Sequence, residues 1–283
     1  MDHRSRAAAL MTLPGLWLLV LFLVPMGAMA LFSFRLGSFG AEREVFTFEH
    51  YREFLANTAF QRLLGRSALI AFQTSLFAVC LAFPLAYFLA FRAGARRLIL
   101  LTIILAPAWT SYLLRLLAWK LILGSSGLLN TLLLSLGLVE EALPILLYSP
   151  AAVVVTLVYV WIPFVSLPIF AALQRIDRSL LEAAADLGST PWETFLRVTL
   201  PLSLPGVAAG FFFAFIPTLG EYVTPLLVGG VRGVMYGNII QDQFVRALNW
   251  PLGSLMSLVM LVAVVLLLLI LSRFVRLSEL SGI

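Results

Sequence analysis

The segment LLEAAADLGSTPWETFLRVTLPLSLPG, residues 180–206, is a polar interval between two long hydrophobic stretches. It carries four charged side chains within a short distance: Glu182, Asp186, Glu193 and Arg197. Their concentration in an otherwise apolar chain raises the question of what this segment contacts.

The segment contains signals for two helices. Ser179 and Glu182 have the spacing of a capping box, in which the serine accepts from a backbone N–H and the glutamate reaches back. Gly188 supplies either a left-handed turn that ends a helix or a close approach to another segment. The run TPWE at residues 190–193 combines a threonine N-cap, a proline at the first helical position and a glutamate three residues after the cap. We therefore expect a short helix, a glycine break and a second helix.

These helices present an apolar face that nothing in their own loop covers. It is formed by Leu180, Ala184, Leu187 and Trp192. An exposed apolar face of this kind calls for a soluble partner or for the packed ends of membrane-spanning helices.

The whole chain has the composition of a membrane protein. Of its 283 residues, 61% are hydrophobic and 12% are charged, whereas a soluble domain has about 25% charged residues. The net charge of +5 is not arranged as a basic stripe with interleaved aromatic residues, which argues against nucleic-acid binding. Cys80 is the only cysteine, so disulfides within the chain and cysteine metal clusters are excluded.

Six stretches are long and apolar enough to cross about 30 Å of hydrocarbon as helices. They are residues 11–33, 67–91, 98–122, 150–173, 206–228 and 252–273. The first is too long for the apolar core of a signal peptide, so we expect it to be a retained span. The sequence therefore predicts an all-α polytopic membrane protein, with six transmembrane helices in a single domain over residues 1–283.

Loop arginines set the expected orientation, because cytoplasmic loops carry an excess of Lys and Arg. Arginines occur in the N-terminus, the second and fourth loops and the C-terminal tail. The third loop has Glu140 and Glu141 but no Lys or Arg. The first loop contains both arginines and glutamates, so it gives little information about the orientation. We expect both termini and the loop at residues 174–205 to be cytoplasmic.

The cytoplasmic loop resembles a known signature. The residues Glu182-Ala183-Ala184, Gly188 and Val198-Thr199-Leu200-Pro201 follow the pattern E-A-A-x3-G-x9-hydrophobic-x-L-P of ABC importer permeases. In that family the loop forms a coupling helix that docks into a groove of the ATPase subunit. The resemblance therefore implies ATPase-coupling roles for Glu182, Ala183, Ala184, Asp186, Gly188, Leu200 and Pro201.

Three further segments resemble the polyamine (spermidine/putrescine) branch of these permeases: residues 109–130, GEYVTPLLVGG at 220–230, and residues 237–254. At residues 248–251 this chain reads LNWP where relatives often read RDWP. The resemblance implies the type I ABC importer (MetI-like) permease fold in the bacterial inner membrane. It also implies three kinds of partner: a second homologous permease subunit, two ATPase subunits and a periplasmic substrate-binding protein. The implied mechanism is ATP-driven alternating access.

The chain has no nucleotide-binding motif of its own. A P-loop needs Gly-Lys followed by Ser or Thr, and the only lysine, Lys120, lies between Trp119 and Leu121. His3 and His50 both fall outside the spans, so no histidine-based metal or hydrolytic site is expected within the membrane. We therefore expect a non-catalytic subunit that holds no cofactor or metal, with ATP and Mg in the partner subunits.

Glu221 is expected within the fifth span, near its outer end. An ionisable group at membrane depth marks a substrate path or an ion pair. A carboxylate beside aromatic faces suits an ammonium cargo, while Arg115 or Lys120 could instead pair with it. The candidate substrate-pathway residues are Glu221, Tyr222, Trp109, Tyr112 and Tyr159. Each aromatic residue could equally be an interface anchor or a packing residue.

In the fifth loop, Asp242, Asn249 and Trp250 are candidate contacts for the periplasmic binding protein. An ordinary polar turn with an interfacial tryptophan explains them equally well.

Two other functions stay open. One is an ABC permease for another solute, such as a ferric ion, an oxyanion or an amino acid derivative. The other is a secondary transporter, which would show inverted repeats with broken helices.

Overall fold

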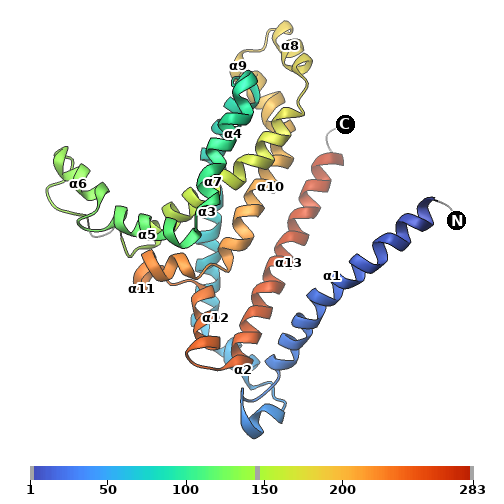
Figure 1. The fold of residues 1–283 in the computed structure, drawn as a ribbon, viewed down its shortest axis with the longest axis vertical. Helices are drawn as coiled ribbons and strands as arrows, with labels where there is room; N and C mark the ends of the chain where they lie inside the picture. The colour runs from blue at the N-terminus through green and yellow to red at the C-terminus, as the bar shows by residue number, and fades with distance from the viewer. Residues whose placement is uncertain (1–2, 144–146, 281–283) are drawn as a thin grey trace. The chain divides into compact units, whose positions relative to one another are not determined.

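The structure is a computed structural model that describes residues 3–143 and 147–280, with side chains described for residue 12 and residues 14–143 and 147–269. The described residues are mostly helical, and their β-pairing consists of one isolated bridge between Arg35 and Phe46 (Figure 1). Six helical segments are long and apolar enough to span a membrane: Pro14–Ser33, Thr58–Phe91, Tyr112–Ser135, Pro150–Gln174, Pro191–Leu219 and Trp250–Leu269. The prediction of an all-α protein with six transmembrane helices is confirmed.

The chain divides into two compact units, which are described separately. The first unit comprises residues 1–61 and 239–273. It contains α1 (His3–Ser33), a 3-10 turn at Gly40–Glu44, α2 (Glu49–Ala56), the end of α12 (Tyr236–Val245) and most of α13 (Trp250–Leu280). The Ser33 and Tyr51 hydroxyls hydrogen-bond at 2.8 Å, and His50 Nε2 lies 3.1 Å from the carbonyl oxygen of Leu36. These contacts hold α2 against the end of α1.

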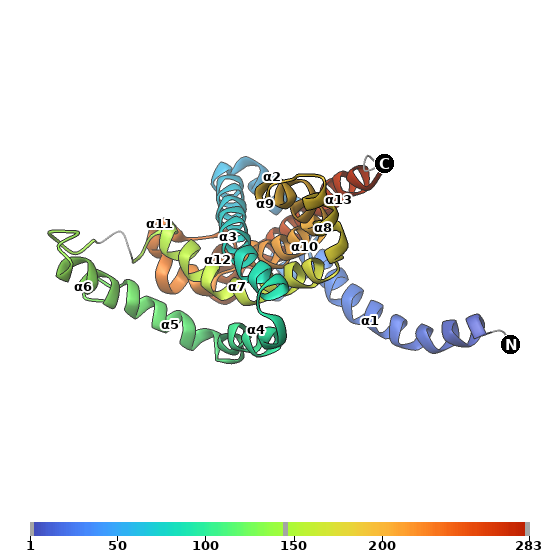
Figure 2. The ribbon, with the colours of Figure 1, turned by 90° about the horizontal axis from the view of Figure 1, so that it is seen from above.

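The second unit, residues 62–238 together with the chain end, contains the remaining helices. They are α3 (Thr58–Phe91, from Arg62 onward), α4 (Arg97–Leu105), α5 (Tyr112–Leu123), α6 (Leu128–Ser135), α7 (Pro150–Gln174), α8 (Arg178–Asp186), α9 (Pro191–Thr194), α10 (Leu200–Leu219) and α11 (Gly230–Gly233). Seen from above, α3, α7 and α10 group together (Figure 2). Helix α7 has the largest buried share of the six spans and forms the centre of this group.

Small residues allow the close packing of this unit. Ala78, Ala82 and Ala86 of α3 are fully buried in one cluster with Val165 and Ile169 of α7. Between membrane helices, where lipid is as apolar as the side chains, small residues let backbones approach and gain van der Waals contact.

Glycine has the same function between α7 and α10. A Cβ added at Gly206 would lie against the side chain of Ala172 and 2.6 Å from the carbonyl oxygen of Pro168. At Gly210 a Cβ would lie 3.1 Å from atoms of Val165. The two helices are therefore in contact at positions where no other residue fits without displacement.

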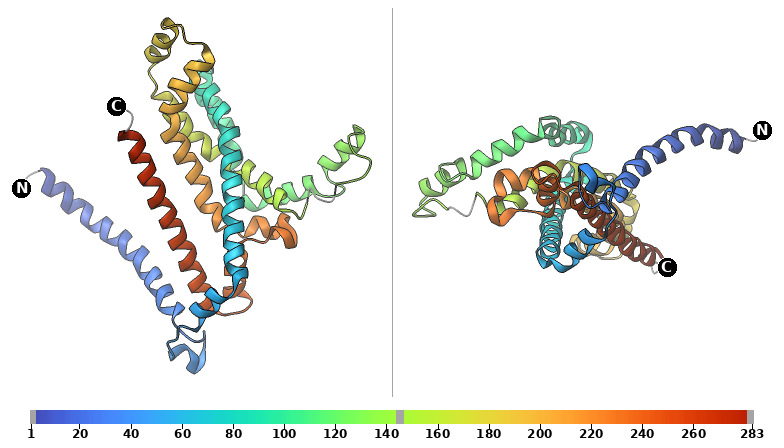
Figure 3. Two further views of the ribbon diagram at one scale, coloured as in Figure 1. Left: turned by 180° about the vertical axis from the view of Figure 1, so that it is seen from behind. Right: turned by 90° about the horizontal axis from the view of Figure 1, so that it is seen from below.

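The third span differs from its prediction at residues 98–122. Helix α4 ends at Leu105, a 3-10 turn covers Ala106–Trp109, and Thr110 has extended backbone before α5 begins at Tyr112. Pro107 lacks the N–H that would continue the α-helix, although Ala106 before it keeps helical backbone. Figures 1 and 3 show α5 and α6 diverging from α3, α7 and α10, so the apolar run predicted as one helix is two helices that change direction.

The fifth span also differs from its predicted range of 206–228. A continuous helical run from Pro191 includes a π-helical turn at Phe195–Thr199 and ends with α10 at Leu219. Glu221 therefore lies just beyond the end of the helix, whereas we expected it inside. Its side chain accepts from backbone N–H groups that follow it, which competes with continuation of the helix.

Candidate functional site

The loop at residues 174–205, which the sequence predicts to be cytoplasmic, folds as α8, a turn and α9. The N-cap of α8 is Asp177, whose carboxylate accepts a hydrogen bond from the N–H of Ser179 at 3.0 Å. This hydrogen bond holds the pKa of Asp177 below its usual value. The predicted capping box of Ser179 and Glu182 is wrong, because the acid two residues before Ser179 takes the cap and Ser179 is already the second helical residue.

The turn after α8 is a complete Schellman motif. Gly188 has φ +85°, its N–H donates to Ala185 O at 2.9 Å, and the N–H of Ser189 donates to Ala184 O at 3.0 Å. Both bonds satisfy carbonyls that the helix end leaves without partners. The left-handed turn predicted at Gly188 is confirmed.

The second helix begins as the sequence predicts. Thr190 Oγ1 accepts from the N–H of Glu193 at 3.3 Å, while Glu193 Oε2 accepts from the N–H of Thr190 at 2.9 Å. Pro191 occupies the first turn, where its missing N–H costs nothing. This reciprocal capping box fixes the angle at which the chain enters the run that becomes α10.

The loop exposes large apolar side chains. Leu187 is 87% exposed and Trp192 is 66% exposed, with Trp192 stacked on Phe195 at 5.4 Å between ring centroids. Glu182, Ala183, Asp186 and Pro201 are exposed, while Ala184 and Leu200 are partly buried. Glu182, Ala183, Asp186 and Pro201 thus lie on an open surface of this loop, which also exposes the hydrophobic side chains of Leu187 and Trp192, whereas Thr199 is buried.

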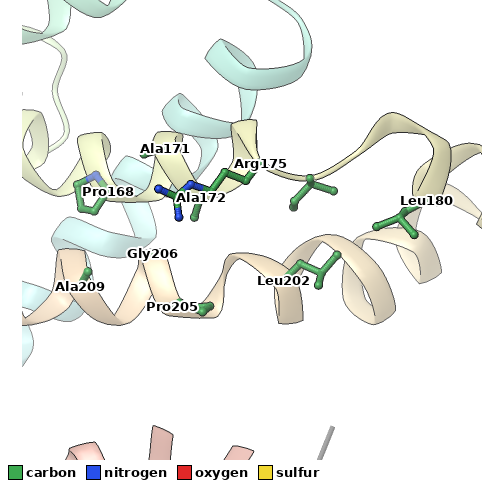
Figure 4. Close-up of a pocket in the computed structure, with 10 residues that line it drawn as sticks. Pro168, Ala171, Ala172, Arg175, Leu180, Leu202, Pro205, Gly206 and Ala209 are labelled. Atoms are coloured by element: carbon green, nitrogen blue, oxygen red, sulfur yellow. The ribbon is translucent and has the colours of Figure 1, made fainter. Parts of the chain in front are cut away.

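A cavity of about 510 Å³ lies between α7 and α10 at the start of α8 (Figure 4). Pro168 and Ala172 of α7, Gly206 of α10 and Leu180 of α8 contribute to its lining. Arg175 is its charged residue, and Figure 4 shows the guanidinium beside Ala172. Leu180 of the loop therefore lines the same cavity as residues of both spanning helices.

The second candidate site surrounds Glu221. Its Oε1 accepts from the N–H groups of Val223 at 2.8 Å and Thr224 at 3.1 Å, and its Oε2 accepts from the hydroxyl of Tyr112 at 2.9 Å. The Tyr112 hydroxyl also lies 2.8 Å from Thr224 Oγ1. The carboxylate is partly buried and is held in one position by three donors. Sequence reasoning did not identify Thr224 as a member of this site.

The cations considered as partners of Glu221 form no ion pair with it in the part of the chain that the structure describes. Arg115 Cζ lies 5.8 Å from the centroid of the Tyr112 ring. Its Nε and Nη1 atoms are buried without a hydrogen-bond partner among the described residues. A guanidinium with unmet donors therefore lies on the same helix as Tyr112, one turn away.

The backbone next to Glu221 is packed tightly against the start of α12. Asn238 Nδ2 donates to the carbonyl oxygen of Tyr222 at 2.8 Å, and Asn238 Oδ1 accepts from the N–H of Met235 at 2.9 Å. A Cβ at Gly237 would lie 2.8 Å from the carbonyl oxygen of Glu221. Tyr222 itself is 43% exposed.

The other aromatic candidates lie elsewhere. Trp109 ends the turn after α4 and is largely exposed. Tyr159 packs on Trp119 at 5.4 Å and lines a separate apolar cavity of about 630 Å³ formed by α3, α5 and α7. The structure thus brings together Tyr112, Glu221, Tyr222 and Thr224, and shows no contact of Trp109 or Tyr159 with them.

The fifth-loop candidates belong to the first unit and have local partners. Asp242 pairs with Arg246 at 3.4 Å, and Asn249 Oδ1 accepts from the N–H of Leu252 at 3.1 Å. The Trp250 ring lies 6.0 Å from Phe32 and 5.8 Å from Phe39. Each side chain thus makes contacts within its own unit that account for its position.

Comparison with known proteins places these features in a family. The model for "Binding-protein-dependent transport system inner membrane component" matches residues 6–280. The spermidine/putrescine transport system permease protein PotB of Escherichia coli K12 is 35% identical over 218 residues, which are 77% of this chain and 78% of that protein. The inner membrane ABC transporter permease protein YdcU of the same organism is 36% identical over 74% of this chain and 70% of its own length.

Solved structures have the same fold. A chain of a bacterial ABC transporter involved in import of the acidic polysaccharide alginate has a TM-score of 0.78 at 17% identity, with 95% of this chain and 94% of that chain covered. A chain of the MetNI methionine ABC transporter in an inward-facing conformation has a TM-score of 0.58 at 18% identity, with 77% of this chain and 95% of that chain covered. The MetI-like fold is confirmed. The chain belongs to the family of binding-protein-dependent transport system inner membrane components and is a membrane-spanning permease of the ABC importer type.

Proposed function

We propose that this permease carries polyamines of the spermidine/putrescine class across the inner membrane, driven by ATP hydrolysis in partner subunits. The observation that carries this proposal is the Glu221 carboxylate, which is fixed at the break after α10. The similarity to permeases named for spermidine and putrescine supports the same cargo.

The geometry around Glu221 leaves room for a cation. A carboxylate has about four acceptor positions, and three are filled here, two on Oε1 and one on Oε2. An ammonium group can take the remaining position on Oε2. Tyr222, the next residue in the chain, is exposed, and a cation gains further attraction from an aromatic face. In this proposal Glu221 and Tyr222 contact the cargo, and Tyr112 positions the carboxylate.

The exposed loop couples this site to the energy source. In the proposed assembly, α8, the Gly188 turn and α9 dock into a groove of an ATPase subunit through Leu187 and Trp192, with Glu182 and Asp186 at the edge of the contact. A periplasmic binding protein delivers cargo, and closure of the ATPase dimer moves α8. Because Leu180 lies at the cavity between α7 and α10, that movement shifts the spans between inward-open and outward-open states.

The assembly has two of these permeases, the second homologous to this chain, and two ATPase subunits. The whole chain, residues 1–283, acts as one permease domain with its loop at 174–205 and both termini in the cytoplasm. Asp242, Asn249 and Trp250 lie on the side that receives the binding protein. Trp109 and Tyr159 line the path at other points in the transport cycle.

One observation favours a different cargo. Nε and Nη1 of Arg115 are buried and have no partner among the described residues. A buried guanidinium with unmet donors suits an oxyanion and repels a polyamine. A solute with a phosphonate or carboxylate group is therefore the second candidate.

Uptake by membrane vesicles that contain the assembled importer distinguishes the two. If the transported solute is a polyamine, Glu221→Gln lowers the uptake of labelled spermidine about tenfold, while the importer still co-purifies as a complex. A tenfold change is equivalent to a free-energy difference of about 1.4 kcal/mol. The matched variant Arg115→Gln leaves that uptake unchanged or raises it. Loss of uptake in Arg115→Gln together with competition by a phosphonate would establish the second candidate. Equal loss of uptake and assembly in Glu221→Gln would mean that the residue is purely structural.

A further inference from the structure

The second unit has another cavity where α3 ends and α8 begins. Its volume is about 360 Å³, within the range of roughly 300–1,000 Å³ found for small-molecule sites. It is lined by Ala90, Gly94, Ala95, Arg97, Leu98 and Arg178, and is called here the Arg97–Arg178 pocket. These residues come from the end of α3, the turn after it, the start of α4 and the start of α8.

The pocket brings together two positive charges that have no counter-charge. Neither Arg97 nor Arg178 forms an ion pair with any carboxylate that the structure describes. Asp177, the acid next to Arg178, directs its carboxylate to the N–H of Ser179. Each arginine is the first residue of a nine-residue helix, where the helix dipole adds to the positive potential. An anionic group between the two guanidinium groups would relieve their mutual repulsion.

The surroundings of the pocket indicate what carries that anionic group. Leu98 lines the pocket and is 64% exposed, and Ile99 and Ile103 continue the exposed apolar surface along α4. In a membrane-spanning chain such a surface suits hydrocarbon. A ligand with an anionic head at the two arginines and hydrocarbon along α4 is a phospholipid. Guanidinium groups match phosphate oxygens with paired hydrogen bonds, and basic pockets at the membrane surface bind anionic headgroups.

We propose that the Arg97–Arg178 pocket binds the headgroup of an anionic phospholipid, with its acyl chains along Leu98, Ile99 and Ile103. The lipid phosphate bridges α4 and α8, two helices that the chain otherwise connects through α5, α6 and α7. It thereby ties the first turn of α8 to the membrane surface. The position of the coupling loop then depends on the lipid composition of the membrane.

The test is native mass spectrometry of the full-length chain in detergent, titrated with phosphatidylglycerol and, separately, with zwitterionic phosphatidylcholine. The double variant Arg97→Gln/Arg178→Gln is expected to bind phosphatidylglycerol at least about tenfold more weakly. The matched control is Arg62→Gln/Arg232→Gln, two exposed arginines of the same unit outside the pocket, which should bind it within about twofold of the unchanged chain. Arg97→Lys/Arg178→Lys retains the charge without the paired geometry and should lie between the two.

Several results would overturn the proposal. These are unchanged phosphatidylglycerol affinity in the Gln double variant, an equal loss in the control, or equal affinity for phosphatidylcholine. Displacement of the lipid by millimolar inorganic phosphate would assign the pocket to a free anion instead. Weaker association with the ATPase subunits at unchanged lipid affinity would assign the arginines to a protein contact.

Discussion

The hydroxyl of Tyr112, the first residue of α5, donates a hydrogen bond of 2.9 Å to Glu221, a residue 109 positions later that follows the end of α10. The same hydroxyl lies 2.8 Å from Thr224. The Tyr112 hydroxyl therefore connects the start of α5 with the segment that follows the end of α10. Any movement of α5 relative to α10 has to move or break this contact.

Tyr112→Phe should weaken this connection and leave the ring in place. Hydrogen bonds to charged groups contribute about 1.5–3 kcal/mol, so we expect a loss of up to about 2 kcal/mol in the free energy of unfolding in mixed micelles. Substrate affinity should fall as well, because Glu221 loses one of three positioning donors. Tyr87→Phe is the matched control, since its ring packs on Phe91 and Phe195. Equal effects of both substitutions would contradict a specific role for the Tyr112 hydroxyl.

Gly188 should tolerate few replacements, because its φ of +85° is costly for residues with a Cβ. No heavy atom lies within 4 Å of a Cβ built there, so the cost is conformational and not a clash. Gly188→Ala should destabilise the end of α8 by about 1 kcal/mol, and Gly188→Asn should be milder. Gly188→Glu should uncouple transport from the ATPase while the chain still inserts into the membrane. Normal ATPase co-purification and normal uptake in Gly188→Glu would contradict the docking role of this turn.

Gly206 tests the contact between α7 and α10. Gly206→Val inserts bulk where a Cβ already meets Ala172 and Pro168, and should destabilise the protein by about 1–3 kcal/mol. Gly65 in α3 provides the control, because a Cβ there has open space around it. Gly65→Ala should be neutral or stabilising, since alanine favours helix over glycine by about 1 kcal/mol. Thermal unfolding in detergent measures both, and similar midpoints for the two variants would count against close packing at Gly206.

The N-cap of α8 should make the loop at residues 174–205 sensitive to acid. The pKa of Asp177 is lowered in the folded state by the Ser179 N–H, so its stabilising effect is present above the unfolded pKa of about 3.9. That effect is lost as pH falls through the lower folded value. Amide exchange in the first turn of α8 should therefore speed up below about pH 4 beyond its intrinsic pH dependence. In Asp177→Asn this extra change should be absent; if it persists, another group is responsible.

Local patterns were sufficient for much of this protein. The six apolar runs, the glycine turn at 188 and the capping box of Thr190 and Glu193 all depend on residues within a few positions of one another. Hydrogen bonds of this range and the solvation of an apolar run by lipid are the same wherever the segment is placed. They can therefore be predicted before any tertiary contact is known. The long E-A-A-to-L-P spacing, likewise local, pointed to the family.

Only the tertiary structure determined which residue is used, or which direction a helix takes, where the sequence allows more than one local arrangement. Asp177 and Ser179 could both cap α8, and the structure shows Asp177 in that position. Pro107, visible in the sequence, accounts for the end of α4, but the new direction that α5 takes from Tyr112 is not revealed by an apolar run. Glu221 has Tyr112 as its partner, and not Arg115 or Lys120, because α5 packs against the segment Pro225–Gly229 that follows Glu221 and so brings a phenol there. Contacts between residues a hundred positions apart follow from helix packing, which no short pattern encodes.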